Sequence, residues 1–200
     1  MRRRLIVAIT GASGAVFGVR VLQRAREFDL ETHLIVSAWG AQTLQHETRL
    51  TKKDLHTIAD VVHRPGDQAA TISSGSFDTI GMVVAPCSVK TLAAISTGLA
   101  DDLVARAADV VIKERRQLVL MVRESPLSPI HLENMLKLSR LGVTIMPPMP
   151  AFYNHPESLE DMIDHIATRT LDQFGLRSET TPRWDGALKP SPSASELVDE

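Results

Sequence analysis

The residues best placed for chemistry are a basic and an acidic side chain, Arg123 and Glu124, that directly follow a continuous apolar run. The run, Leu118 to Val122, has the length and composition of a parallel strand that is covered on both faces. In open α/β sheets, ligands bind beyond the carboxyl ends of the strands. We therefore expect Arg123 and Glu124 to stand at a ligand site.

The chain up to and including Arg123 is basic, because residues 106–123 carry five basic and two acidic side chains. A polyanionic small molecule is the expected partner. Arg106 and Lys113 lie seven residues apart on an expected helix, which places them on nearly the same face, about 10 Å apart along the axis. Each also has a structural alternative, in which Arg106 pairs with Asp102 or Asp109, or Lys113 pairs with Asp109.

A glycine-rich turn follows the first expected strand, which spans Leu5 to Thr10. The turn, Gly11-Ala12-Ser13-Gly14, leads into an expected helix, 15–28, with apolar residues at helical spacing. Strand, glycine turn and helix form a phosphate-binding layout, because backbone N–H groups at a helix N-terminus face an anion. The glycines are three apart, which differs from the dinucleotide fingerprint. A tight turn with Ser13 as the helix cap is the structural alternative.

Two more expected strands end at a serine that begins a helix. Ser37 follows the strand 33–36, and Ser88 follows the strand 79–85, which we expect Pro86 to end. Lys90 lies in the first turn of the second helix, where a cation opposes the helix dipole unless it contacts an anionic ligand. Several such residues at the carboxyl edge of one parallel sheet outline a ligand crevice.

These residues are positioned by alternating strands and helices, which indicates an α/β fold with a mostly parallel sheet. A proline-rich stretch, 147–150, follows the last expected strand, 143–146, and places Tyr153. We expect residues 65–76 to be a loop, either a linker or a flexible wall over a site. The other expected helices span residues 52–60, 89–97, 131–141 and 159–174.

The composition narrows the functional class. The 200 residues are 44% hydrophobic, enough for one domain, which we place at residues 1–185 with a disordered tail at 186–200. The net charge of −2 and the 4% aromatic content argue against nucleic acid and anionic membranes as partners.

Cys87 is the only cysteine, which is compatible with a cytoplasmic location. The sequence contains neither a Cys-x-x-Cys nor a His-Glu-x-x-His motif, so we expect no metal site. No apolar run reaches the roughly 18 residues of a membrane span, and we assign the N-terminus to the first strand rather than to a targeting segment.

Long blocks of the sequence closely resemble the UbiX-type flavin prenyltransferases. They are GASGA (11–15), APCSVKTLA (85–93), the block 106–142, PPMPAFYNHP (147–156) and PRW (182–184). Within that family the chain is most similar to the B subunit-type proteins that accompany hydroxyaryl acid decarboxylases, a likeness to which DQAATISSGSF (67–77) adds. The resemblance covers nearly the whole chain as far as Trp184.

The resemblance implies a Rossmann-like three-layer sandwich that assembles into trimers and dodecamers. It implies an enzyme that joins a dimethylallyl group from dimethylallyl phosphate to N5 and C6 of reduced FMN, closing a fourth ring without a metal. The product, prenylated FMN, would serve as the cofactor of a separate UbiD-type decarboxylase.

The resemblance also assigns roles by position. Residues expected to bind FMN are Gly11, Ala12, Ser13, Ser37, Ser88, Val89, Lys90, Thr91 and Arg123. Residues expected to bind the prenyl donor are Arg106, Lys113, Tyr153, Arg169 and Trp184, of which Trp184 closes over the prenyl group. Catalytic and proton-handling roles fall to Ser13, Glu47, Lys113 and Glu124. Phe17 departs from the tyrosine often found at its position, where an aromatic side chain is expected to pack.

Two other functions fit part of the pattern. A non-catalytic FMN-binding subunit would need the same glycine turn and serines, but not the second cationic group of Lys113, Tyr153 and Arg169. A flavin-dependent decarboxylase of related fold would act on an aromatic acid directly, without a prenyl donor. A nicotinamide dehydrogenase is disfavoured, because the full fingerprint and a clearly placed ribose-binding carboxylate are missing.

Overall fold

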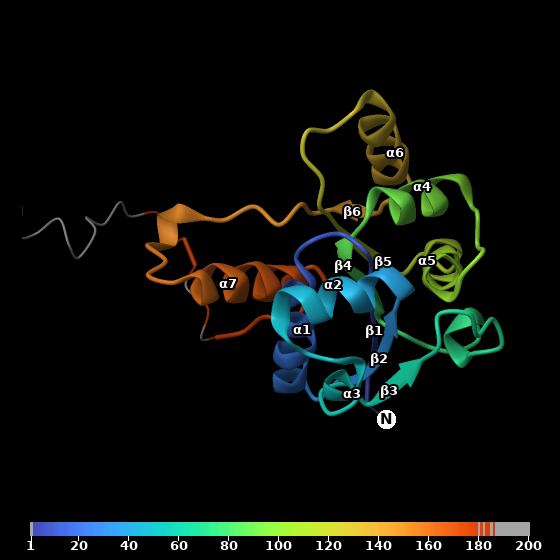
Figure 1. Ribbon diagram of the computed structural model, residues 1–200, viewed down its shortest axis with the longest axis horizontal. Helices are drawn as coiled ribbons and strands as arrows, with labels where there is room; N and C mark the ends of the chain where they lie inside the picture. The colour runs from blue at the N-terminus through green and yellow to red at the C-terminus, as the bar shows by residue number, and fades with distance from the viewer. Residues whose placement is uncertain (1, 180, 182, 185, 187–200) are drawn as a thin grey trace, which may run out of the picture.

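A six-stranded sheet, in which every strand runs parallel to its neighbours, forms the centre of the computed structural model (Figure 1). The order is β3-β2-β1-β4-β5-β6, so the direction of winding reverses between β1 and β4. This is the Rossmann-like α/β arrangement that the sequence predicts. The strands are β1 Arg4–Ile9, β2 Glu31–Val36, β3 Val61–His63, β4 Gly81–Cys87, β5 Gln117–Val122 and β6 Thr144–Ile145.

The structure describes residues 2–179, 181, 183, 184 and 186. The expected tail, 186–200, lies outside the described residues except for Gly186. The assignment of residues 1–185 to a single domain stays a prediction.

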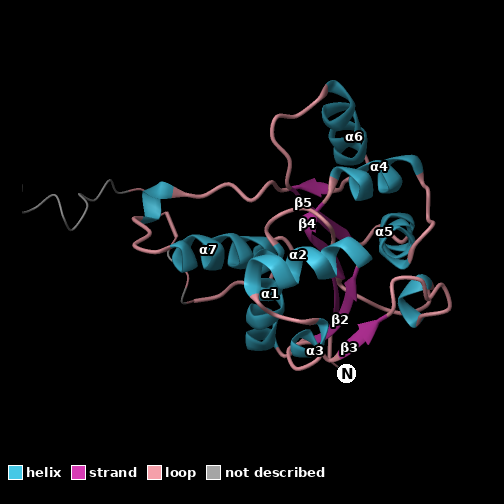
Figure 2. Ribbon diagram, viewed as in Figure 1, coloured by secondary structure: helices cyan, strands magenta, loops and turns pink. Residues whose placement is uncertain are grey.

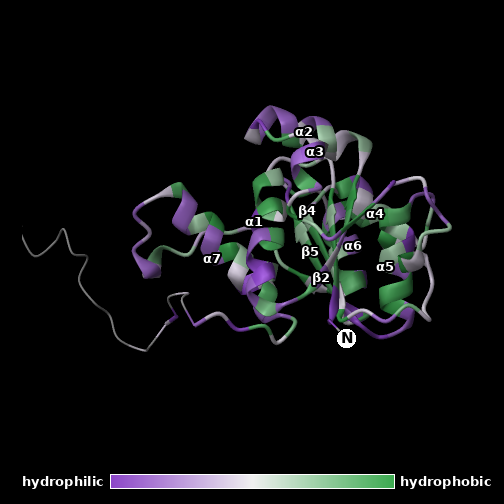
Figure 3. Ribbon diagram, turned by 90° about the horizontal axis from the view of Figure 1, so that it is seen from below, coloured by the Kyte–Doolittle hydropathy of each residue, from purple (hydrophilic) through white to green (hydrophobic). Residues whose placement is uncertain are grey.

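Helices cover both faces of the sheet (Figures 2 and 3). One face packs against α1, α2, α3 and α7, and the other against α4, α5 and α6. The chain from 147 to 158 leaves the sheet as an extended arm that leads into α7 (Figure 1). The helices are α1 Ala15–Ala25, α2 Ala38–Thr48, α3 Lys52–Leu55, α4 Val89–Thr97, α5 Leu103–Lys113, α6 Pro129–Arg140 and α7 Leu159–Asp172, with short 3-10 turns at η1 Arg26–Phe28, η2 Thr71–Ser73 and η3 Phe152–Asn154.

The central strands are apolar throughout because both of their faces are buried. In β1, Leu5, Val7 and Ile9 pack into the cluster with α1 and α7, whereas Ile6 and Ala8 pack into the cluster with α4 and α5. All five are at most 1% exposed. The continuous apolar run that predicts a doubly covered strand is therefore confirmed.

The expected helix 52–60 is wrong beyond its first turn. Only α3 is helical, and the following backbone forms tight turns, such as Thr57 N to Asp54 O. The carboxylate of Asp60 accepts hydrogen bonds from the backbone N–H and the hydroxyl of Thr32 on β2. Those bonds draw the chain to the sheet edge, where it forms the short strand β3, which the sequence analysis missed.

The expectation that Pro86 ends the fourth strand is also wrong. β4 continues to Cys87, and the Ala85–Pro86 peptide bond is cis. Pro86 has no N–H to give to a ladder, but the register with β5 shifts between Val84 and Cys87. Its carbonyl oxygen accepts a hydrogen bond from Thr10 N at the end of β1.

None of the helices within the described residues is both long and apolar enough to cross a membrane.

Gly18 sets how closely α1 approaches the sheet, so Gly18→Ala should destabilise the protein. An added Cβ would lie 2.3 Å from the carbonyl oxygen of Ala85 and 2.7 Å from Cγ1 of Ile9. We expect a loss of about 1–3 kcal/mol in the free energy of unfolding, measured with denaturant, because a backbone carbonyl on a central strand cannot move aside. Gly66→Ala is the matched control, since its Cβ would meet nothing within 4 Å. A Gly18→Ala protein as stable as wild type would contradict this account.

Candidate active site

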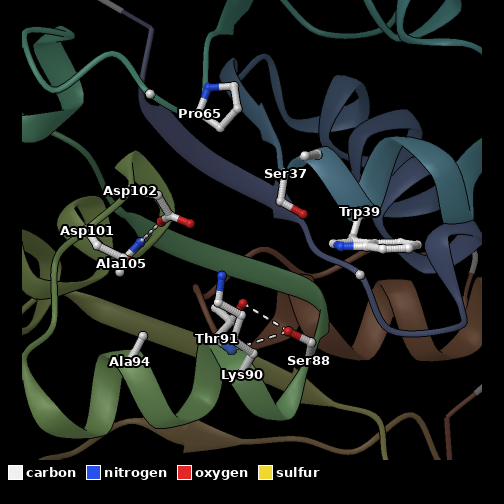
Figure 4. A pocket seen from close by; sticks show the side chains of 13 residues that line it. Ser37, Trp39, Pro65, Ser88, Lys90, Thr91, Ala94, Asp101, Asp102 and Ala105 are labelled. Atoms are coloured by element: carbon white, nitrogen blue, oxygen red, sulfur yellow. Dashed lines mark hydrogen bonds between the residues drawn. The ribbon is translucent and has the colours of Figure 1, made fainter.

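A cavity of about 400 Å³ lies at the carboxyl edge of the sheet (Figure 4). We call it the carboxyl-edge cavity. Its walls come from the first turns of α2, α4 and α5, from the turn after β1, and from the chain that follows β3. Its volume falls within the range of roughly 300–1,000 Å³ that is typical of small-molecule sites. The lining residues are Gly11, Ser37, Ala38, Trp39, Pro65, Gly66, Ser88, Lys90, Thr91, Ala94, Asp101, Asp102 and Ala105.

Three helix N-termini meet at this cavity, each with a side-chain cap. Ser37 accepts a hydrogen bond from Gly40 N at 3.0 Å, and Ser88 accepts one from Thr91 N at 3.2 Å. Asp102 caps α5 by accepting from Ala105 N at 2.8 Å. The remaining N–H groups of such first turns and the helix dipoles favour an anion, and the exposed Lys90 adds a full positive charge. These groups fit a phosphate such as that of FMN.

The predicted FMN-binding positions are thus partly brought together. Gly11, Ser37, Ser88, Lys90 and Thr91 line one cavity, although they come from three separate parts of the chain. The expected caps at Ser37 and Ser88 are confirmed.

The glycine turn is used differently from the expected phosphate loop. Gly14 N and Ala15 N donate to the carboxylate of Glu47 at 2.8 and 3.0 Å. The N-terminus of α1 therefore already holds an anionic group, supplied by the last turn of α2. Its N-cap residue is Gly14, which has a φ of 102°, so the alternative with Ser13 as the cap is wrong. Ser13 lies within this turn and is exposed, and Glu47 bonds to Gly14, the residue that follows it.

Thr10 has a structural role at the site that the sequence analysis did not detect. Its hydroxyl accepts from Ser88 N and donates to Pro86 O, both at 2.8 Å. The side chain is 1% exposed. Thr10 therefore joins the end of β1 to the turn from which α4 begins, and this contact fixes the position of Ser88. A threonine directly before the glycine turn is the only sequence signal for it.

The aromatic and acidic parts of the cavity wall were also missed as site residues. Trp39 lies in the first turn of α2 with 70% of its surface exposed, and its ring borders the cavity (Figure 4). An added Cβ at Gly11 would lie 2.6 Å from Cβ of Trp39, so only glycine permits this approach. Asp101 and Asp102 add carboxylates that can accept hydrogen bonds from ligand hydroxyl groups.

Arg123 and Glu124 follow β5 as expected and are both exposed. Arg123 N donates to Cys87 O at 3.2 Å, so Arg123 stands beside the end of β4. Glu124 accepts a hydrogen bond from Ser125 N at 3.0 Å. Neither is among the residues that line the carboxyl-edge cavity, but both stand at the same edge of the sheet.

A second group of predicted residues meets where the arm, α7 and the C-terminal segment come together. The Tyr153 ring lies edge-on to the rings of His165 and Trp184, with centroid distances of 6.2 and 5.8 Å. We call this group the arm cluster; its members are Tyr153, Asn154, His165, Arg169, Asp172, Arg183 and Trp184.

The electrostatics of the arm cluster centre on one carboxylate. Asp172 accepts hydrogen bonds from both Arg169 and Arg183. Although burial opposes it, these bonds hold the pKa of Asp172 below its usual value. Burial and the nearby positive charge of Arg169 lower the pKa of His165, which favours the neutral imidazole. The arm cluster thus combines two guanidinium groups, one carboxylate and an aromatic wall.

Lys113 and Arg106 lie apart from the arm cluster. Lys113, the last residue of α5, pairs with Glu114 shortly before β5 begins, so it stands at the amino end of the sheet. Arg106 donates to Ser73 O at 3.2 Å and to Asp109 at 2.8 Å, one of the two pairings given above as its structural alternative. Because α5 and α7 cover opposite faces of the sheet, one chain does not bring Lys113 to Tyr153 and Arg169.

Cys87 is fully buried, and burial raises the pKa of its thiol, so it behaves as a small apolar side chain. Among the described residues, no three His, Cys, Asp or Glu side chains are grouped so that they could hold a metal ion.

Comparisons with known proteins point to one family. A family model described as Flavoprotein matches residues 1–171. The Bacillus subtilis protein named "Probable UbiX-like flavin prenyltransferase" is 58% identical over 186 residues, which cover 93% of this chain and 91% of the relative. The Escherichia coli K12 protein named "Flavin prenyltransferase UbiX" is 52% identical over 188 residues, covering 92% of this chain and all of the relative.

Solved structures agree with the sequence comparisons. The crystal structure of AnUbiX (PadA1) in complex with FMN and dimethylallyl pyrophosphate superposes with a TM-score of 0.92 at 51% identity, covering 94% of this chain and all of that one. The dodecameric FMN-dependent UbiX-like decarboxylase of Escherichia coli O157:H7 has a TM-score of 0.89 at 59% identity, covering 92% of this chain and all of that one.

The hydroxyl of Thr10 should matter for FMN binding although it does not line the cavity. Thr10→Val keeps the shape of the side chain but leaves the partly buried N–H of Ser88 without its acceptor, at a cost of about 1–2 kcal/mol. If the first turn of α4 shifts as a result, FMN affinity falls about tenfold. Flavin fluorescence titration measures this, and Thr10→Ser, which restores the hydroxyl, should recover most of the affinity. A folded Thr10→Val protein with wild-type affinity would refute the role.

Proposed function

Because this chain belongs to the flavoprotein family and, within it, to the UbiX-like flavin prenyltransferases, we propose that its carboxyl-edge cavity and its arm cluster are the two halves of one prenyl-transfer site. The protein joins a dimethylallyl group to N5 and C6 of reduced FMN, and the product is prenylated FMN. The observation that carries the proposal is the pairing of an anion-binding, polar cavity with a separate cationic and aromatic cluster.

The carboxyl-edge cavity is the FMN side. The first turns of α2 and α4 and the ammonium group of Lys90 hold the phosphate, in the manner of other helix N-termini. Asp101 and Asp102 accept hydrogen bonds from ribityl hydroxyls, and the exposed face of Trp39 borders the ring system. The remaining FMN-binding residues are Ala12, Ser13, Val89 and Arg123, which lie next to lining residues or at the same sheet edge.

The arm cluster is the donor side. Cleavage of the allylic C–O bond leaves growing negative charge on the phosphate, and Arg169 with the hydroxyl of Tyr153 stabilises it. The allylic fragment carries positive charge, which aromatic faces such as that of Trp184 stabilise. A protein that only carried FMN would have no use for this second cationic group, which argues against the carrier function.

Glu47 is the residue best held to accept the proton that leaves C6. The backbone N–H groups of Gly14 and Ala15, at the start of α1, fix one of its carboxylate oxygens next to Ser13. A positioned carboxylate within reach of a reacting proton is a general base. Glu124 at the end of β5 and the released phosphate are the other acceptors at this edge.

Lys113 takes part from a second copy of the chain. Within one chain it stands at the amino end of the sheet, on the face opposite α7, whereas its predicted role is at the donor phosphate. A homo-oligomer resolves this difference, and a related protein is dodecameric. Arg106 lies on the same face of α5, so it would also reach the shared site from the neighbouring copy. We propose a trimer-based assembly in which α5 of one copy meets the arm of its neighbour.

The wider setting follows from the product. A UbiD-type decarboxylase is the proposed recipient of prenylated FMN, and a cytoplasmic location is the proposal that fits a single, buried cysteine. Direct decarboxylation of an aromatic acid is the second candidate function, because one of the similar structures is described as a decarboxylase.

Mass spectrometry of the flavin tests the proposed function. The protein is incubated without oxygen with reduced FMN and dimethylallyl phosphate, and the flavin is then released. The expected product is heavier than FMN by one five-carbon unit. Tightly bound FMN that is released unchanged, with an active relative as the control, would favour the carrier function. Loss of carbon dioxide from an aromatic acid without any donor would favour the decarboxylase.

Mixed oligomers test the shared site. Lys113→Ala should keep FMN binding and lose prenyl transfer, and so should Arg169→Ala. Each substitution removes a positively charged side chain that stabilises the donor phosphate. When the two inactive chains are co-expressed, some interfaces combine an intact Lys113 with an intact Arg169, so part of the activity should return. Lys53→Ala, a charge change on the exposed surface of α3, is the control and should stay active. Mixed oligomers that remain inactive would contradict a site shared between copies.

A further inference from the structure

We propose that Asp172 is a positioning residue that fastens the C-terminal segment to α7 and so holds Trp184 over Tyr153 when the donor binds. The inference rests on the proposed function, because the donor is the ligand that the arm cluster would receive. It assigns a function in donor binding to the ion pair of Asp172 and Arg183, which is so far only part of the arm cluster's electrostatics.

The contact between Asp172 and Arg183 is a two-point fork. Nη1 of Arg183 donates to Oδ2 of Asp172 at 2.9 Å, and Nη2 donates to Oδ1 at 2.8 Å. Paired N–H···O bonds of this kind fix the plane of the guanidinium group as well as its distance. The side chain of Asp172 is only 6% exposed, whereas that of Arg183 is 39% exposed. A sheltered carboxylate that holds a surface arginine in a fork restrains it far more than an ordinary surface ion pair.

By holding Arg183, the fork also restrains Trp184, the next residue in the sequence. Trp184 stands edge-on to Tyr153 at a centroid distance of 5.8 Å and an interplanar angle of 83°. Tyr153 belongs to the arm, so this ring contact brings the C-terminal segment against a distant part of the chain. Leu176, Ser178 and Thr181 are buried, so the segment is anchored at these three positions. Loss of the fork would therefore release Arg183 and Trp184, while the three buried residues stay in place.

Arg169 links this contact to the donor. It lies one turn before Asp172 on α7 and donates to Oδ2, the same oxygen that accepts from Nη1 of Arg183. Two guanidinium groups thus share one negative charge. When a donor phosphate binds Arg169, that arginine has a second anion to pair with, and more of the Asp172 charge is left for Arg183. Donor binding and the closure of Trp184 therefore strengthen each other.

Kinetics of Arg183→Gln and Asp172→Asn test the inference. Arg183→Gln should raise the KM for dimethylallyl phosphate about tenfold, while the Kd for FMN stays at the wild-type value. Asp172→Asn breaks the same fork but also frees Arg169 for the donor phosphate, so it should raise the KM by less. Arg183→Lys, which keeps the charge but cannot form the fork, should fall between wild type and Arg183→Gln. Arg177→Gln is the matched control, because Arg177 is an exposed arginine on the same segment and lies outside the arm cluster. If Asp172→Asn does not fold, Arg183→Gln alone carries the test.

Fluorescence gives a measurement that does not depend on activity. The sequence has two tryptophans, so Trp39→Phe leaves Trp184 as the only one. In this background, Arg183→Gln should shift the emission of Trp184 to longer wavelength and increase its quenching by acrylamide. Dimethylallyl phosphate should protect Trp184 from quenching in the parent but not in the Arg183→Gln variant.

Two results would overturn the proposal. One is an Arg183→Gln protein with wild-type KM for the donor and unchanged Trp184 quenching. The other is an equal loss of FMN and donor binding, which would show that the ion pair only supports the fold. If the wild-type protein forms no prenylated FMN but its Trp184 still responds to the fork variants, the proposed function fails while the fastening role of Asp172 survives.

Discussion

The parallel direction of all six strands is the constraint on which the site depends. Each strand ends at the same edge, so the segments that follow β1, β2, β3 and β4 all meet there, although they are far apart in the sequence. The helices that begin at this edge point their N-termini, with their unpaired N–H groups, toward one cavity. The hydroxyl of Thr10 then fixes the spacing between two of these segments, because it bonds to both Pro86 and Ser88.

The same architecture explains why the arm cluster lies apart from the sheet. The arm leaves β6 and returns as α7, which packs along α1 (Figure 1). Asp164 on α7 accepts hydrogen bonds from Arg20 at 3.0 Å and from Nε of Arg24 at 2.7 Å, and both arginines lie on α1. These side chains are about three-quarters shielded from solvent, so the ion pairs hold the two helices more firmly than exposed ones would. α7, which carries part of the arm cluster, is therefore fixed to α1. That helix begins at the glycine turn, where its N-terminus binds the carboxylate of Glu47.

The sequence predicted the features that depend on local chemistry. The α/β class, the buried strands and the caps at Ser37 and Ser88 all follow from patterns within a few residues. It failed where tertiary contacts decide: Asp60 is drawn to Thr32 on β2, Pro86 fits inside a strand because the register shifts there, and Glu47 reaches the N-terminus of α1 from another helix. The roles of Trp39 and Thr10 depend on which segments lie side by side, and no spacing in the sequence shows that. Lys113 lay on the expected helix, but only the structure shows that α5 ends at the amino end of the sheet, away from the carboxyl-edge cavity.

A crystal structure of the protein with bound FMN tests the central claim most directly, namely that the carboxyl-edge cavity holds FMN and leaves the arm cluster free for the donor. The predicted result is a phosphate at the first turns of α2 and α4, within hydrogen-bonding distance of backbone N–H groups between Ser88 and Thr91, with Glu47 still bonded to Gly14 and Ala15. A phosphate bound by Arg169 and Arg183, or one that displaces Glu47 from the N-terminus of α1, would contradict the account.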